Sequence, residues 1–156
     1  LVTFGGYWVQ ARTFSWLPIA WSLPVVSLTV AILHANNWHD IRSDAAKGCH
    51  TLAVTLGENG SEIYYRILVF APFGLAAFYM LGDHVFGWSV AAPLTVIGVA
   101  VALPGAFGLV RRSQRPGRDP LAGLDGSTAR LHLVFNVLLI LAFLVAVYLP
   151  APWGVR

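Results

Sequence analysis

The fold is decided by one stretch, Asn36-Asn37-Trp38-His39-Asp40-Ile41-Arg42-Ser43-Asp44, which directly follows the mostly apolar segment 16–35. A helix of about twenty residues is ~30 Å long, which matches the hydrocarbon core of a bilayer. If this helix continues through the polar stretch, Asn37, Asp40 and Asp44 recur at i, i+3 and i+7 and fall within a sector of roughly 60°. The sequence therefore predicts a membrane span that ends in one amide and two carboxylates on a common face.

Oxygen ligands repeated along one helix face suit a hard cation such as Mg²⁺, which binds carboxylates and bridges to substrate phosphates. The alternative is a solvated helix end in which Asp40 and Asp44 pair with Arg42 or Lys47, since carboxylates cost little near the membrane interface. Carboxylates near a helix C-terminus oppose the helix dipole unless a cation is supplied, which favours the cation site. Spacing alone leaves both interpretations open.

Composition identifies a membrane protein with one helix bundle. The chain of 156 residues is 57% hydrophobic and 11% charged, whereas soluble domains carry roughly 25% charged residues. The net charge of +3 does not indicate a nucleic-acid partner, because half of the ten Lys and Arg residues gather in one polar segment and its flank, as in cytoplasmic loops of membrane proteins. These are Arg111, Arg112, Arg115, Arg118 and Arg130.

Hydropathy predicts four full spans and the end of an earlier helix in an all-α polytopic transmembrane bundle. The spans are residues 16–35, 63–81, 86–110 and 131–149, and the earlier helix ends near residue 9.

The polar connections 38–62 and 111–128 join these spans. In the first, Gly48 is the expected helix stop, Glu58-Asn59-Gly60 the expected turn and Ser61 the expected cap of the next helix. Together the two connections hold most of the Lys and Arg residues. The positive-inside tendency therefore predicts that both connections, and with them the aspartates, face the cytoplasm.

The same residues carry a family resemblance. The pattern Asn36-Asn37-x-x-Asp40-x-x-x-Asp44, followed by Gly48, Thr51-Leu52-Ala53-Val54 and Leu56-Gly57, resembles the second aspartate-rich motif of the UbiA superfamily of membrane prenyltransferases. The preceding Ile32-Leu33-His34 and the upstream Tyr7-Trp8-Val9-Gln10 resemble the menaquinone branch, which prenylates 1,4-dihydroxy-2-naphthoate. The likeness is close over residues 3–57 and rests beyond them mainly on hydropathy and on Thr128-Ala129-Arg130.

The resemblance implies a Mg²⁺-dependent aromatic prenyltransferase in a bacterial-type inner membrane, with membrane lipid around it and no nucleic acid. Its substrates would be a polyprenyl diphosphate and an aromatic acceptor, dihydroxynaphthoate. Asp40 and Asp44 would be catalytic and, with Asn37, would hold the metal. Lys47 would contact the diphosphate, and Asn36 and His34 would contact substrate.

Simpler roles for the flanking residues stay open. Lys47 is equally well explained as a solvated loop lysine, Asn36 as a helix-packing contact and His34 as a histidine hydrogen-bonded to a neighbouring helix. The sequence also departs from the menaquinone pattern, with His39 where many members have Arg, Arg42 near an expected acid, and Cys49 and His50 at positions that are usually basic. These departures affect the identity of the acceptor more than the metal chemistry.

Three rival functions remain. Within the superfamily, the acceptor can instead be another aromatic acid such as a 4-hydroxybenzoate, a chlorin or a sugar phosphate. Outside it, Asp40 and Asp44 can form the ion site of a transporter or channel segment, although transporter sites usually lie at the bilayer midplane. A third possibility is an inactive scaffold that keeps the helices.

The whole of residues 1–156 is expected to be a single transmembrane domain, the C-terminal half of such an enzyme, equivalent to helices five to nine of nine. The superfamily's other aspartate-rich motif, which holds a second metal, has no counterpart in this sequence. We therefore expect purified residues 1–156 to show no prenyl transfer until the missing N-terminal part is supplied, as measured with a radiolabelled polyprenyl diphosphate.

Overall fold

The computed structural model describes residues 2–86, 99–115 and 120–148, and within these residues the regular structure is helical, without strands. This confirms the all-α prediction. The helices are α1 (Val2–Ala11), α2 (Leu17–His39), α3 (Ile41–Ala46), α4 (Leu52–Phe86), α6 (Leu103–Ser113) and α7 (Leu124–Tyr148).

Three of the described helices are long and apolar enough to cross a membrane, over Leu17–His39, Leu52–Gly82 and Leu124–Val145. They correspond to the first, second and fourth predicted spans. The second begins at residue 52 instead of 63, and the last helix begins at residue 124 instead of 131. The predicted span 86–110 lies partly outside the described residues. Its C-terminal part overlaps helix α6.

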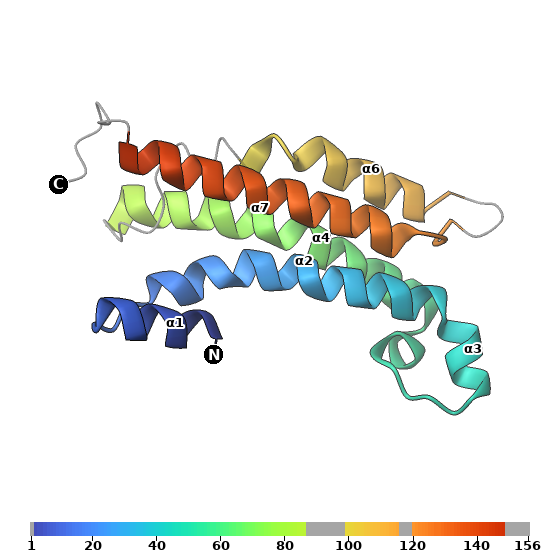
Figure 1. The fold of residues 1–156 in the computed structure, drawn as a ribbon. Coiled ribbons are helices and arrows are strands. Elements are labelled where there is room, and N and C mark those ends of the chain that lie inside the picture. The colour runs from blue at the N-terminus through green and yellow to red at the C-terminus, as the bar shows by residue number, and fades with distance from the viewer. Residues whose placement is uncertain (1, 87–98, 116–119, 149–156) are drawn as a thin grey trace.

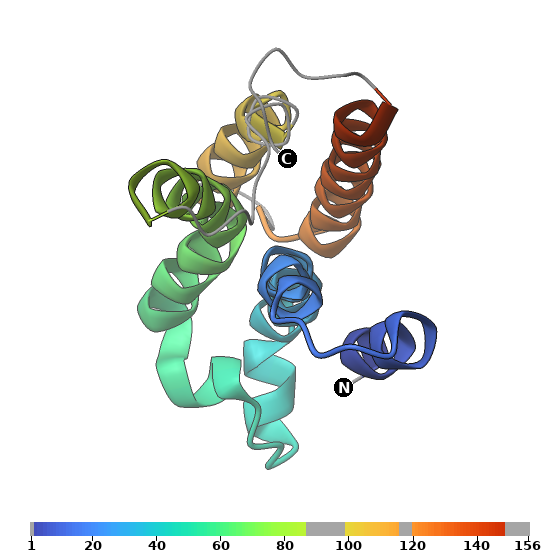
Figure 2. The same ribbon diagram turned by 90° about the vertical axis from the view of Figure 1, so that its left-hand side faces the viewer.

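Helix α2 is the centre of the bundle. It packs against α1, α4 and α7, while α6 packs against α4 and α7 (Figures 1 and 2). The helix α3 continues beyond α2 and contacts α4 at one end of the bundle (Figure 1). The apolar cluster between the long helices contains several small side chains that allow close approach of the backbones, as is common between helices in membranes. They are Ala31, Ala35, Ala53 and Ala76, each at most 1% exposed.

Hydrogen bonds from side chains fix the antiparallel register of α2 and α4. Tyr79 Oη donates to the Ala20 carbonyl at 2.7 Å, and Ser27 Oγ donates to the Leu68 carbonyl at 2.8 Å. Two further contacts continue this series: His34 Nε2 lies 3.1 Å from the Ser61 carbonyl oxygen, and Trp38 Nε1 donates to Glu58 Oε2 at 3.1 Å. Because residues 20, 27 and 34 are two helical turns apart, these contacts lie along one side of α2.

Helix α7 is joined to α4 by a buried pair of hydroxyls. The Tyr65 hydroxyl lies 2.7 Å from Thr128 Oγ1, which itself donates to the Leu124 carbonyl at 2.7 Å. Tyr65 therefore donates to Thr128, and both side chains are fully buried. This chain of hydrogen bonds satisfies two polar groups that would otherwise be costly inside an apolar bundle.

Arg112 fixes the end of α6 to the beginning of α7. Its guanidinium donates to Ser127 Oγ at 2.8 Å and to the Ala122 carbonyl at 2.6 Å. The sequence placed this arginine in a loop as a determinant of topology, whereas it lies in the last turn of α6, which extends to Ser113.

The two polar connections lie at the same end of the bundle, as predicted. Figure 1 shows the C-terminal end of α6 and the N-terminal end of α7 beside the end that carries α3. A hydrogen bond of 3.1 Å from Gln114 Nε2 to Glu62 Oε1 links the two regions directly.

The first connection differs from the prediction in its second half. Glu58-Asn59-Gly60 is helical and not a turn, because α4 already begins at Leu52. Thr51, and not Ser61, caps this helix: its hydroxyl accepts a hydrogen bond of 3.2 Å from the Val54 amide. Propensity favours a turn at an Asn-Gly pair, but backbone groups close to a membrane are best satisfied within a helix.

Ser61 is a buried packing residue. It is fully buried, and its hydroxyl donates to the Ala53 carbonyl at 3.3 Å. This contact spans a kink in α4 at Gly57, where φ is 68° and ψ is −179°. Only glycine adopts this backbone region readily, so Gly57 separates the short first segment of α4 from its long second part.

We predict that Gly57→Ala lowers the free energy of unfolding by about 1–3 kcal/mol, because alanine is strained at this φ and ψ. Gly74→Ala is the matched control: Gly74 lies in the same helix without a positive φ, and a Cβ at either glycine meets no atom within 4 Å. The control should be neutral or slightly stabilising. Chemical denaturation in detergent measures both, and equal shifts for the two variants would contradict the role given to Gly57.

Candidate functional site

The aspartate motif lies at a helix break. Helix α2 ends at His39 and α3 begins at Ile41, with φ −91° and ψ 6° at Asp40 between them. The prediction of one continuous helix through Asp44 is therefore wrong at this residue. Helical bonding persists on both sides, because the Asp40 amide donates to the Asn36 carbonyl at 3.1 Å and the Asp44 amide to the Asp40 carbonyl at 2.9 Å.

The three predicted ligands are buried to a similar extent. Asn37, Asp40 and Asp44 are each half-buried, whereas the intervening His39 and Ser43 are exposed. Equal burial is compatible with the predicted common face. Their role as metal ligands stays a prediction.

The break changes the electrostatics of the two carboxylates. Asp44 lies in the first turn of α3, where a carboxylate is favoured by the helix dipole instead of opposed by it. Asp40 is at once the last cap of α2 and the first cap of α3, and its side chain does not cap the α3 amides. Its Oδ1 lies 2.9 Å from His39 Nδ1 on the exposed side. The argument that a helix dipole demands a cation here is accordingly weaker than the sequence indicated.

The donor set fits Mg²⁺ only if other ligands complete it. Among the residues that the structure describes, no group of three or more His, Cys, Asp or Glu side chains could hold a metal ion. The segment offers two carboxylates and one amide. Mg²⁺ commonly binds through one or two carboxylates together with waters and substrate phosphates, so these residues suit an ion shared with a phosphate.

The end of α3 is formed as predicted at Gly48. This residue has φ 72°, its amide donates to the Ala45 carbonyl at 3.1 Å, and the Cys49 amide donates to the Asp44 carbonyl at 2.9 Å. This is the Schellman arrangement that closes a helix C-terminus. Lys47, the C-cap residue, has an exposed side chain at the same end of the molecule.

His34 and Asn36 lie in different surroundings. His34 is 3% exposed, and its Nε2 lies 3.1 Å from the Ser61 carbonyl oxygen. Because a carbonyl only accepts, Nε2 carries the proton in this contact. Its ring also packs edge-to-face on Tyr64, with centroids 4.8 Å apart. His34 thus has the contact to a neighbouring helix that was the simpler expectation, while Asn36 is exposed; substrate binding by either residue stays a prediction.

Sequence reasoning missed Glu58, which was assigned to a turn. The Trp38 indole donates to its Oε2 at 3.1 Å, and Arg42 Nε lies 3.9 Å from its Oε1. Trp38 and Arg42 are the residues two before and two after Asp40. No local pattern signals this contact, because it joins positions 20 residues apart.

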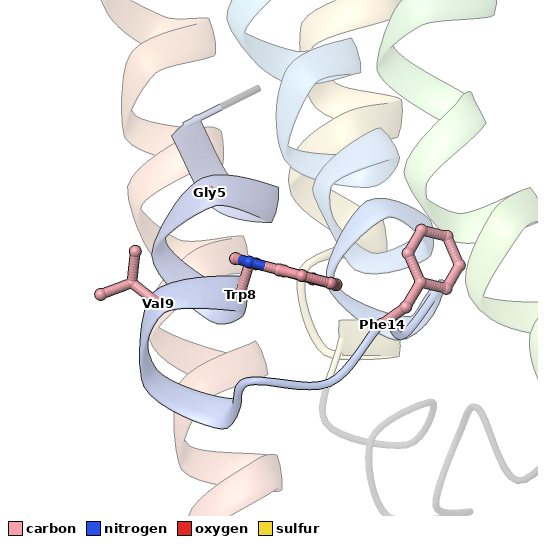
Figure 3. Close-up of a pocket in the computed structure, with 4 residues that line it drawn as sticks. All are labelled: Gly5, Trp8, Val9 and Phe14. Atoms are coloured by element: carbon pink, nitrogen blue, oxygen red, sulfur yellow. The ribbon is translucent and has the colours of Figure 1, made fainter.

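A hollow elsewhere on the described surface does not suit the predicted chemistry. It is lined by Gly5, Trp8, Val9 and Phe14, with the Trp8 ring extending toward Phe14 (Figure 3). The hollow lies between α1 and the start of α2, and the 23 residues of α2 separate it from Asp40 by about 35 Å. Its lining is apolar and offers no side chain to bind a diphosphate.

Comparison with known proteins agrees with the motif. The model of the UbiA prenyltransferase family matches residues 1–124. The chain is 32% identical over 152 residues to mouse UbiA prenyltransferase domain-containing protein 1, 33% identical over 152 residues to the zebrafish protein of that name, and 32% identical over 147 residues to the Drosophila homologue.

Each of these alignments covers 94% of the chain but only 42%, 42% and 38% of the respective relative. The chain thus spans about two fifths of the length of the curated relatives it matches. No solved structure is significantly similar to it. The family model covers most of the chain, including the whole aspartate motif, and on this ground the chain belongs to the UbiA prenyltransferase family.

Proposed function

We propose that this protein contributes the second aspartate motif of an enzyme that transfers a polyprenyl group from its diphosphate to 1,4-dihydroxy-2-naphthoate. The bond between C1 of the isoprenoid and the diphosphate oxygen breaks and diphosphate leaves. A carbon–carbon bond forms from C1 to the ring carbon that bears the carboxylate, and the bond from that carbon to the carboxylate breaks to release CO₂. The observation that supports the proposal is the half-buried pair Asp40 and Asp44 at a helix break, at the polar end of a membrane bundle of this family.

Each residue of the motif has a role in this proposal. Asp40, Asp44 and the Asn37 amide would hold Mg²⁺, which would neutralise charge on the departing diphosphate. Lys47 is exposed one helical turn after Asp44, and its ammonium would bind phosphate oxygens from the solvent side. The apolar bundle beneath would receive the isoprenoid chain.

The acceptor is the less supported part of the proposal. It rests on the resemblance of Ile32-Leu33-His34-x-Asn36-Asn37 to the menaquinone branch, with His34 and Asn36 as candidate contacts. The names of the curated relatives specify a UbiA prenyltransferase domain and no acceptor. Prenylation of a 4-hydroxybenzoate-like acid therefore remains the alternative.

We further propose that the motif faces the cytoplasm. Arg111, Arg112 and Arg115 lie at the end of α6, which is the end of the bundle that also carries α3 (Figure 1). Cytoplasmic segments are enriched in such residues. A bacterial inner membrane is supported only by the menaquinone-type motif, since the relatives named above are animal proteins.

In the complete protein, Asp40→Asn and Asp44→Asn should each lower prenyl transfer at saturating Mg²⁺ by roughly 100-fold or more, because each removes a charged ligand where negative charge develops. Asp125→Asn is the matched control. Asp125 is a half-buried acid in the first turn of α7, at the same end of the bundle, and its substitution should leave the rate unchanged.

The same variants separate the enzyme from a transporter. Binding of farnesyl diphosphate that depends on Mg²⁺ and is lost in Asp40→Asn supports the proposal. Ion flux into liposomes, without such binding, would instead support an ion site in a transport protein.

A second assay addresses the acceptor. With a polyprenyl diphosphate donor, we expect the complete protein to prenylate 1,4-dihydroxy-2-naphthoate and not 4-hydroxybenzoate, as followed by chromatography of the extracted lipids. Transfer to the benzoate alone would refute the proposed acceptor and leave the metal site unaffected.

A further inference from the structure

The two helices that meet at Asp40 are both contacted by one carboxylate. Glu58 Oε2 accepts a hydrogen bond of 3.1 Å from Trp38 Nε1 on α2, and Glu58 Oε1 lies 3.9 Å from Arg42 Nε on α3. Trp38 and Arg42 are each two residues from Asp40. Glu58 therefore contacts one residue on each side of the break at Asp40, where the chain changes direction.

The short helix α3 cannot hold its own direction. It has six residues, none of them buried, and helices of this length are not stable in isolation. The Asp40 side chain does not cap it either. The angle between α2 and α3, and with it the relative position of Asp40 and Asp44, must come from contacts with α4, the helix against which α3 packs.

Trp38 attaches the other side of the break, the C-terminal end of α2, to the same helix α4. Its side chain is 5% exposed and its ring lies against Tyr65, with centroids 5.9 Å apart. A hydrogen bond from a buried indole to a carboxylate is charge-assisted and directional. The pairing with Arg42 adds little, because that side chain is 93% exposed and such surface ion pairs are weak.

The backbone of Glu58 is fixed against α2, whereas its side chain is 55% exposed. It directly follows Gly57, whose positive φ ends the short first segment of α4, so Glu58 is the first residue of the long second part of that helix. The α2–α4 contacts at Ser61 and Leu68 fix this part against α2.

We propose that Trp38 and Glu58 are positioning residues for the diphosphate site: their hydrogen bond holds the end of α2 against α4, the helix on which α3 also packs, so that Asp40 and Asp44 converge on the same ligand. This inference rests on the proposed function of the two aspartates. The hydrogen bond acts through geometry, so an uncharged acceptor at position 58 should serve as well as the carboxylate.

The test uses the complete protein in detergent, with farnesyl diphosphate and Mg²⁺ as the probe. Trp38→Phe keeps a buried ring without the donor, and Glu58→Ala removes the acceptor. Each should weaken Mg²⁺-dependent binding roughly tenfold, as loss of a residue that orients a metal ligand commonly does. The double variant should be no weaker than either single variant, because both remove the same bond. Glu58→Gln, which keeps an acceptor oxygen, should bind within about twofold of the parent.

Tyr79→Phe is the matched structural control. It removes one hydrogen bond, from Tyr79 Oη to the Ala20 carbonyl at 2.7 Å, between the same two helices at their opposite end. It should lower the midpoint of thermal unfolding about as much as Trp38→Phe does, without weakening the Mg²⁺-dependent binding of farnesyl diphosphate. A purely structural role for Trp38 would give both variants the same binding.

The outcomes separate the two proposals. If Asp40→Asn abolishes binding but Trp38→Phe and Glu58→Ala bind like Tyr79→Phe, the positioning role is refuted and the proposed function stands. Loss of binding in Glu58→Gln equal to that in Glu58→Ala also refutes it, since charge and not geometry would then matter. If Asp40→Asn leaves Mg²⁺-dependent binding intact, the proposed function fails and this inference fails with it. If Trp38→Phe folds poorly, Glu58→Ala still provides the test, because the Glu58 side chain is 55% exposed and its truncation leaves the core intact.

Discussion

The antiparallel pairing of α2 with α4 is the constraint on which the other features depend. In a bilayer, apolar side chains gain little by leaving lipid for another helix, so close packing of small residues and interhelical hydrogen bonds must supply specificity. Here four side chains, Tyr79, Ser27, His34 and Trp38, make such bonds along the full length of the pair. The two helices cannot slide past one another without breaking these bonds, and the position of each helix end follows from this register.

This register explains why the polar cap forms where it does. The contact between Trp38 and Glu58 is the last of the series, and the backbone leaves the bundle direction just beyond it on both helices, at Asp40 on α2 and at Gly57 on α4. The breaks have different causes. At Gly57 the backbone adopts a positive φ that favours glycine. At Asp40 the backbone changes direction while the helical hydrogen bonds on either side of it persist.

The described residues offer part of the ligand set that the proposed cation would need. Two half-buried carboxylates and an amide lie at the polar end of an apolar bundle, and a cation held there would need oxygens from waters or from a phosphate. This agrees with a chain that belongs to the UbiA prenyltransferase family and covers about two fifths of its curated relatives. Asp44 lies in the first turn of α3, so the break removes the unfavourable helix dipole that a single continuous helix would impose on it.

Local composition was sufficient to predict the membrane class, three of the long helices, the helix stop at Gly48 and the spacing of Asn37, Asp40 and Asp44. Hydropathy and the backbone freedom of glycine depend on a few neighbouring residues, and they do not depend on the tertiary contacts of the chain. The break at Asp40, the helical Glu58-Asn59-Gly60 and the partners of His34 and Trp38 were decided only by tertiary structure. The partners of His34 and Trp38 are 27 and 20 positions away in the sequence. Such contacts exist only once α2 and α4 lie in a single register, and no pattern within either helix specifies that register.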